Sequence, residues 1–269
     1  MSELQIGVFD SGLGGLTAVR ELMQILPRES IVYFGDTARV PYGTRSRETI
    51  QKFAVQDLRF LLEQDLKAVL VACGTVSSVA LPELQAMTEI PVIGVVHPTA
   101  MAACRTTKNK KIGILGTSAT VKSGSYQSAV ASIDPHVSVT ATACPLFVPL
   151  VENGYLSGQI TELAAMEYIK PLQAAGVDTV ILGCTHYPLL KPVLSRLFGP
   201  DVTLIDSGRE AALELADVLR KTGKLSSSGE GKRRYYVSDE VSNFSHIAGM
   251  FLDRSIDGQV EKVAIRTDD

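Results

Sequence analysis

Two cysteines at equivalent places in the chain are the residues best suited to chemistry. Cys73 follows the apolar segment LKAVLVA and precedes Thr75, and Cys184 follows VDTVILG and precedes Thr185 and His186. Four cysteines occur in all, without a CxxC motif or zinc-finger spacing, so we expect reduced thiols and no metal site. A free thiol has a pKa of about 8.5, which lets it give up or return a proton near neutral pH after modest tuning.

A pair of thiols on opposite sides of a small cleft suits the inversion of a stereocentre. One thiolate removes a proton from a carbon atom, and the opposite thiol returns a proton to the other face. We expect Asp10 to adjust the protonation of Cys73, and His186 to adjust that of Cys184. Hydroxyl groups and the backbone N–H groups of a glycine-rich turn could hold a carboxylate; the hydroxyls belong to Ser11, Thr75, Thr117 and Thr185.

Ordinary structural roles compete with this interpretation. A cysteine at the end of a strand is usually a small core residue, and a buried histidine often satisfies a backbone carbonyl. The equivalent placement of Cys73 and Cys184 favours a reactive pair, whereas Cys104 and Cys144 lack such neighbours and are predicted to serve packing.

Strand patterns alternate with helix patterns along nearly the whole chain, which is typical of parallel sheets built from βαβ units. One of the predicted helices covers 78–87, with a proline near its start. The predicted strands are 5–9, 30–36, 67–73, 90–96, 111–117, 139–145, 177–184 and 201–207. Ligands of such sheets bind outside the carboxyl ends of the strands, where the candidate residues lie.

The second half of the chain repeats the first. KIGILGT at 111–117 matches QIGVFDS, and VDTVILGC matches KAVLVAC. This repetition predicts an α/β protein with two similar domains. If the carboxyl-end faces of their mainly parallel sheets meet, the domains face each other over a central cleft. The segment after about residue 209 is too short for a domain of its own and is expected to complete one of the two.

Composition excludes several classes of protein. The chain has 269 residues, 45% of them hydrophobic and 20% charged, as in an ordinary globular protein. Its net charge of −3 does not suggest a positively charged surface for binding nucleic acid. The N-terminus enters a strand pattern almost at once, and no apolar segment reaches the roughly 18 residues needed to span a membrane. We therefore expect a cytoplasmic protein without nucleic-acid or membrane partners.

The turn DSGLGGLT at 10–17 admits a different function. It resembles a dinucleotide-binding turn, but Thr17 stands where the third glycine of GxGxxG belongs. Its glycines would serve equally well to bring the backbone close to a small anion. A nucleotide-binding regulatory protein with inert cysteines is therefore an alternative.

Five motifs together resemble the glutamate racemases, within the aspartate/glutamate racemase family. These enzymes supply D-glutamate for bacterial peptidoglycan without a cofactor. The resemblance covers essentially the whole chain and rests on FDSGLGG (9–15), GDTARVPYG (35–43), VACGTVSS (71–78), PLVENG (149–154) and LGCTHYP (182–188).

The resemblance implies a function for each matching position. Cys73 and Cys184 would be the paired acid and base, assisted by Asp10 and His186, with Glu152 acting on His186. It implies no pyridoxal phosphate, a homodimer, and two domains, 1–98 with 209–269 and 99–208. The implied substrate-binding residues are Asp10, Ser11, Tyr42, Gly43, Gly74, Thr75, Thr117, Thr185 and His186.

One position departs from the family pattern. Gly74 stands where the family usually has asparagine, directly after the first cysteine. We expect its lack of a side chain to leave room and to remove a polar contact with the substrate. The hypothesis is therefore a racemase that interconverts L-glutamate and D-glutamate, with aspartate or another amino acid as the alternative substrate.

Overall fold

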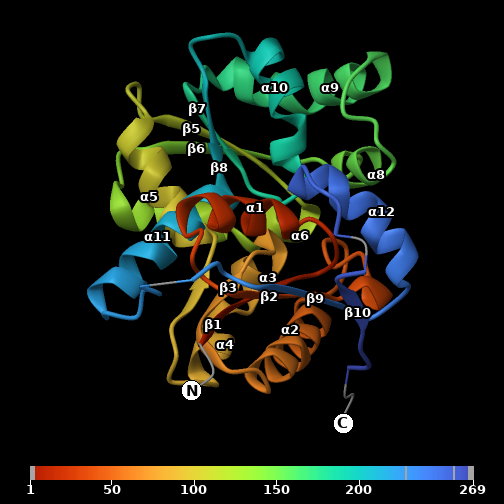
Figure 1. The fold of residues 1–269 in the computed structure, drawn as a ribbon. Helices are drawn as coiled ribbons and strands as arrows, with labels where there is room; N and C mark the ends of the chain where they lie inside the picture. The colour runs from red at the N-terminus through yellow and green to blue at the C-terminus, as the bar shows by residue number, and fades with distance from the viewer. Residues whose placement is uncertain (1–3, 228, 257, 266–269) are drawn as a thin grey trace.

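The chain folds into two α/β domains, each built on a parallel sheet flanked by helices (Figure 1). The computed structural model describes residues 4–227, 229–256 and 258–265. The first sheet has the strand order β10-β9-β2-β1-β3-β4 and the second has β6-β5-β7-β8. These sheets confirm the predicted fold class.

The first sheet is buried on both faces because helices cover each side. Along β1, Ile6 and Val8 face a core shared with α1 and α11, whereas Phe9 faces a core shared with α2. Its strands are β1 (Gln5–Asp10), β2 (Ile31–Gly35), β3 (Leu66–Val71), β4 (Val92–Gly94), β9 (Arg233–Val237) and β10 (Val260–Lys262).

The second sheet repeats the topology of the first. In each, the second strand of the repeat lies outside the first strand, and the third and fourth strands follow on the other side. This shared order matches the repeat predicted from the sequence. The strands are β5 (Lys111–Gly116), β6 (Ser138–Ala143), β7 (Thr179–Leu182) and β8 (Thr203–Asp206).

Helices fill the connections between strands. The α-helices are α1 (Leu16–Ile25), α2 (Arg47–Leu62), α3 (Gly74–Val79), α4 (Leu81–Ala86), α5 (Val96–Thr106), α6 (Ser118–Ser123), α7 (Ser125–Ile133), α8 (Phe147–Glu152), α9 (Gln159–Ala175), α10 (Lys191–Phe198), α11 (Ser207–Lys221) and α12 (Val241–Leu252). The short 3₁₀ helices are η1 (Thr37–Arg39) and η2 (Tyr187–Leu190). No helix within the described residues is long and apolar enough to cross a membrane.

One predicted helix is divided in two. The segment 78–87 was expected to be a single helix, but α3 ends at Val79 and α4 begins at Leu81. Pro82 stands in the first turn of α4, where its missing N–H costs no hydrogen bond, and the chain breaks just before it. α3 thus forms a separate short helix directly behind Cys73.

The C-terminal segment belongs with the first sheet. β9 pairs with β2, and β10 pairs with β9. Because β4 and β5 lie in different sheets, the chain changes sheets between Gly94 and Lys111. The domain boundaries at 98–99 and 208–209 stay predictions.

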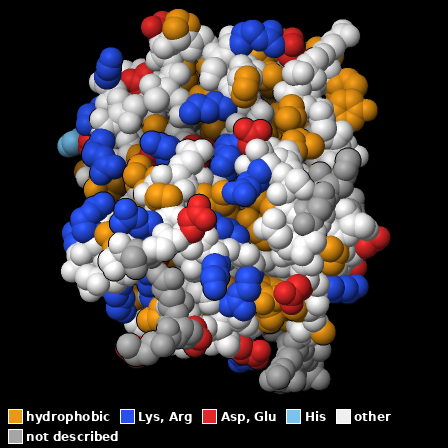
Figure 2. Space-filling model, viewed as in Figure 1, with side chains coloured by type: hydrophobic (Ala, Val, Ile, Leu, Met, Phe, Trp, Pro, Cys, Tyr) orange, Lys and Arg blue, Asp and Glu red, His pale blue; other side chains and the backbone are white. Residues whose placement is uncertain are grey.

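Charged side chains are unevenly spread over the surface. On the face in Figure 2, Lys and Arg side chains gather mainly over the part that holds α5 and α11. Several are paired with acids there: Arg209 with Glu21, and both Arg220 and Lys221 with Asp217. These pairs reduce the net positive charge of this surface.

A buried ion pair fastens the segment after α11 to the first sheet. Lys67 Nζ lies 2.5 Å from Glu29 Oε2, and both side chains are at most 5% exposed. Glu29 also accepts hydrogen bonds from the backbone and hydroxyl of Ser226, at 2.8 and 3.0 Å. Lys67 donates to the carbonyl of Lys224 at 2.8 Å.

We predict that Lys67→Met lowers the free energy of unfolding by about 3–5 kcal/mol, because it leaves the Glu29 carboxylate buried and unpaired. Chemical denaturation measures the change. Lys170→Met is the matched control, because Lys170 pairs with Glu167 at 2.7 Å on the surface and should cost less than about 1 kcal/mol. Equal losses in the two variants would contradict the prediction.

Candidate active site

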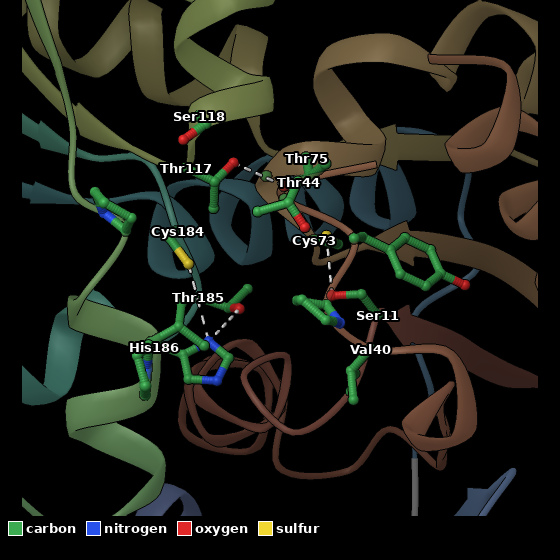
Figure 3. Close-up of a pocket in the computed structure, with 18 of the residues that line it drawn as sticks. Ser11, Val40, Thr44, Cys73, Thr75, Thr117, Ser118, Cys184, Thr185 and His186 are labelled. Carbon is green, nitrogen blue, oxygen red and sulfur yellow. Dashed lines mark hydrogen bonds between the residues drawn. The ribbon is translucent and has the colours of Figure 1, made fainter. Parts of the chain in front are cut away.

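The carboxyl ends of the two sheets enclose a cavity of about 340 Å³ (Figure 3). Cys73 follows β3 and Cys184 follows β7, which are equivalent strands of the two sheets. Figure 3 shows their side chains on opposite sides of the cavity, as expected from the repeat. The predicted site residues that line it are Ser11, Tyr42, Gly43, Cys73, Gly74, Thr75, Thr117, Glu152, Cys184, Thr185 and His186.

Cys73 has a buried, negatively charged neighbourhood. It is 5% exposed, and its thiol donates a hydrogen bond to Ser11 Oγ at 3.4 Å. Burial, followed by the negative charge of Asp10, raises the pKa of Cys73 to about 12. The thiol is therefore protonated at neutral pH and is placed to donate a proton into the cavity.

Cys184 begins a chain of polar contacts. Its Sγ lies 3.8 Å from His186 Nδ1, and His186 Nε2 lies 2.8 Å from Glu152 Oε1. Burial alone would lower the pKa of His186, but its interactions with Cys184 and Glu152 outweigh burial and raise it to about 10. The imidazole is thus positively charged at neutral pH, beside the second thiol. Phe251 of α12 packs edge-on against this ring, with the ring centroids 5.4 Å apart.

Asp10 lies behind the cavity wall rather than in it. Its side chain is fully buried and accepts hydrogen bonds from the Gly12 N–H at 3.0 Å and from Thr185 Oγ1 at 3.4 Å. Burial raises the pKa of Asp10, and the positive charge of His186 opposes this rise. Asp10 acts on Cys73 through charge, and its placement does not fit the predicted direct contact with a substrate.

Hydroxyl groups bridge the two halves across the cavity. Thr75 Oγ1 from α3 and Thr117 Oγ1 before α6 lie 3.0 Å apart. The backbone carbonyl of Gly43 accepts a hydrogen bond from the N–H of Ala119 at 3.0 Å. These contacts place polar groups from both sheets beside the two thiols.

Tyr42 lines the cavity, but its hydroxyl is hydrogen-bonded to carboxyl groups that do not. The hydroxyl donates to Asp36 and lies 3.0 Å from Asp57 Oδ2, both behind the cavity wall. A substrate contact through the Tyr42 hydroxyl is therefore not available in this structure.

The expectation that Gly74 leaves room for the substrate is wrong. A Cβ atom at Gly74 would lie 2.3 Å from the carbonyl oxygen of Gly183, which is backbone and cannot swing away. The opposite strand end therefore occupies the space of a side chain, and Gly74 allows the segments that carry Cys73 and Cys184 to approach closely.

The glycine-rich turn is packed rather than open. A Cβ atom at Gly14 would lie 2.1 Å from Thr185 Oγ1, and one at Gly15 would lie 2.5 Å from the Cβ of Asp10. The hydroxyl of Thr17 donates to the carbonyl of Thr185 at 2.9 Å. The turn serves contact with the second half, which opposes the nucleotide-binding alternative.

Sequence reasoning missed several residues of the cavity. Cys144, predicted to serve packing, is fully buried, yet it forms part of the wall. The signal was available, since most of these residues stand inside or beside the motifs at 9–15, 35–43 and 149–154. The lining residues outside the predicted site list are Gly12, Val40, Pro41, Thr44, Ser118, Cys144, Pro145, Val148 and Pro149.

Comparison with known proteins assigns the chain to a family. Residues 6–215 match the model of the Asp/Glu/Hydantoin racemase family. The chain is 48% identical to a glutamate racemase of Neisseria meningitidis over 262 residues, which is 97% of this chain and 96% of that protein. It is 44% identical to a glutamate racemase of Geobacter metallireducens over 264 residues, or 98% and 97% of the two chains.

Solved structures agree with this assignment. A glutamate racemase of Bacillus anthracis superposes with a TM-score of 0.95 at 41% identity, covering 98% of this chain and 99% of that one. A glutamate racemase of Francisella tularensis, solved with D-glutamate, gives a TM-score of 0.93 at 39% identity and covers 100% of both chains. The chain therefore belongs to the Asp/Glu/Hydantoin racemase family.

Proposed function

We propose that this protein interconverts L-glutamate and D-glutamate by moving protons at Cα between two cysteines. The observation that carries the proposal is the placement of Cys73 and Cys184, from equivalent strands, on opposite sides of one cavity. The relatives at 44–48% identity are glutamate racemases, and one solved relative holds D-glutamate. Both support glutamate as the substrate.

In each turnover one thiolate takes the proton from Cα, and the opposite thiol delivers its own proton to the other face. The first cysteine then ends as a thiol and the second as a thiolate, so the cavity is left ready for the reverse reaction. The C–H bond is a weak acid, and hydrogen bonds to the substrate carboxylate in a closed cavity stabilise the charge that develops. Ser11, Thr75, Thr117 and Thr185 are the hydroxyl donors proposed for this task.

The charges around the two thiols differ, which gives the supporting residues distinct roles. The positive charge of His186 lies beside Cys184, held by Glu152, whereas the negative charge of Asp10 acts on Cys73. We propose that the positive charge of His186 stabilises the thiolate form of Cys184, whereas burial and Asp10 favour the thiol form of Cys73; the reverse reaction starts with the two forms exchanged. The two thiols themselves suffice for both proton transfers, so no pyridoxal phosphate or other cofactor is proposed.

The setting of the reaction follows from the same family. We propose that the product D-glutamate feeds peptidoglycan synthesis in the cytoplasm, and that the enzyme works as a homodimer of two-domain subunits divided at 98–99 and 208–209. Aspartate as the main substrate gains no support from Gly74, since the Gly183 carbonyl fills the space beside it.

Replacing either thiol should stop racemisation. Cys73→Ser and Cys184→Ser keep the shape of the site, but a hydroxyl is a far poorer base, so kcat should fall at least about 10³-fold. Circular dichroism of L-glutamate decaying to zero measures the rate, and the far-ultraviolet spectrum checks the fold. Cys104→Ser is the matched control, because Cys104 lies outside the cavity and should keep full activity. Appreciable turnover by either active-site variant would refute the two-cysteine scheme.

Glu152 should set the pH at which kcat/KM falls on the alkaline side. His186 is protonated below a pKa of about 10 and loses its charge as the pH rises through that value. Glu152→Gln removes the negative charge that raises this pKa and weakens the hydrogen bond to the imidazole, so the alkaline fall of kcat/KM should move to lower pH. A pH profile of both proteins measures the shift. An alkaline limb at the same pH in the variant would show that His186 is not the group that titrates.

A side chain at Gly74 should separate the two reactive segments. In Gly74→Ala the added Cβ meets the Gly183 carbonyl, so kcat/KM should fall by about 10- to 100-fold through misplacement of the thiols. Gly249→Ala serves as the control, because its added Cβ would meet only the Arg254 carbonyl at an ordinary 3.7 Å. If Gly74→Ala matched the wild type, the close approach would have no catalytic importance.

A further inference from the structure

One wall of the cavity depends on a single buried anchor. Residues 40–44 contribute five consecutive residues to the lining, yet the segment runs over the surface and Val40 is 46% exposed. Tyr42 is the exception, at 1% exposed. What holds the Tyr42 side chain therefore helps to set the position of this wall.

The anchor is a compact network of charged groups. Tyr42 donates to Asp36 Oδ2, and Arg39 Nε donates to the same oxygen at 2.6 Å. Arg39 Nη2 donates to Asp57 Oδ1 at 2.7 Å, and its guanidinium lies over the ring of Phe53, 4.3 Å from the centroid. Asp36 and Asp57 are both fully buried, so two carboxyl groups share one cation away from water.

Counting hydrogen atoms shows that one of these carboxyl groups must hold a proton. A tyrosine hydroxyl has one hydrogen, but the Tyr42 oxygen lies within hydrogen-bond distance of both Asp36 Oδ2 and Asp57 Oδ2. When that hydrogen goes to Asp36, the closer of the two, the 3.0 Å contact with Asp57 is a second hydrogen bond if Asp57 Oδ2 carries a hydrogen. The alternative is two ionised carboxylates against one oxygen in a buried site, which is costly.

We propose that Asp57 is a positioning residue of the substrate site, which acts as a neutral carboxylic acid and donates its proton to Tyr42. The resulting chain runs from Asp57 through Tyr42 to the Asp36 carboxylate, which Arg39 neutralises. Burial and the nearby charge of Asp36 raise the pKa of Asp57 well above its ordinary value, in agreement with the hydrogen count.

The network also reaches the opposite half of the molecule. Gly43, next to Tyr42, accepts the hydrogen bond from the Ala119 N–H, and its Cα approaches Thr117 so closely that a Cβ would lie 2.9 Å away. Asp57 itself does not line the cavity. Its effect is therefore on the placement of the wall against which the substrate packs, and so on KM more than on kcat.

Two substitutions of Asp57 separate its roles. In Asp57→Asn the amide N–H₂ can donate to Tyr42 while the amide oxygen accepts from Arg39, so KM for glutamate should stay within about threefold of the wild type. In Asp57→Leu the side chain has no donor for Tyr42 and no acceptor for Arg39, so KM should rise about tenfold or more with a smaller change in kcat.

The inference rests on the proposed racemase reaction, so the protonation is also measured without substrate. Infrared spectroscopy at neutral pH should show a carboxylic-acid C=O band that disappears in Asp57→Asn. It should persist in Asp178→Asn, since hydrogen bonds from residues 107–109 hold the pKa of Asp178 below its usual value despite partial burial.

The outcomes are distinguishable. A band lost only in Asp57→Asn, with KM raised in Asp57→Leu, supports the inference. Absence of the band, or equal damage by Asn and Leu, would overturn the proton on Asp57. An unchanged KM in a folded Asp57→Leu protein would overturn the positioning role. If Asp57→Leu does not fold, KM is measured in Tyr42→Phe instead, and an unchanged value there would overturn it. An inactive wild type with the band present would count against the proposed reaction alone.

Discussion

The close approach of two backbone segments is the constraint on which the site depends. Gly74 and Gly183 follow equivalent strands of the two sheets, and the carbonyl of one fills the space where the other would carry a side chain. Gly14 makes a second close contact, with the side chain of Thr185. These contacts bring together residues more than 100 positions apart and place a thiol on each side of a small enclosed space. Glycine at each of these positions therefore permits the close approach seen in this structure.

Electrostatics then makes the two sides unlike. A thiol that must alternate between acid and base needs neighbours that stabilise one form without trapping it. Cys73 is biased toward the thiol by burial and by Asp10, while Cys184 stands beside an imidazolium held by Glu152. Asp10 and His186 also act on each other, because the charge of His186 opposes the rise in the pKa of Asp10. The charges on the two sides of the site are thus coupled directly, through Asp10 and His186, as well as through the substrate.

Much of this arrangement could be predicted from the sequence, because it follows from local rules. Apolar segments between helical ones predict parallel strands, and the carboxyl ends of such strands are where ligands bind, which placed Cys73, Cys184 and Thr117 correctly.

What depends on contacts between distant segments could not be predicted. The hydroxyl of Tyr42 turns away from the cavity because Asp36 and Asp57 lie behind it, and nothing in VPYG indicates this. Gly74 was expected to leave room for the substrate. The Gly183 carbonyl fills that space, but its position is known only once the two sheets are assembled. Pro82 stands in the first turn of a helix, as predicted, but the break at Ala80 that separates α3 from α4 was not predicted.

The most direct test of the central claim is to follow the Cα hydrogen of glutamate in D₂O. L-Glutamate is incubated with the enzyme, without added cofactor, and deuterium at Cα is measured separately in the two enantiomers at low conversion. Two thiols on opposite faces predict that the D-glutamate formed carries solvent deuterium, while the remaining L-glutamate keeps its original hydrogen. Deuterium entering both enantiomers equally from the start, or D-glutamate that keeps the original hydrogen, would mean that one group serves both faces and would contradict the account.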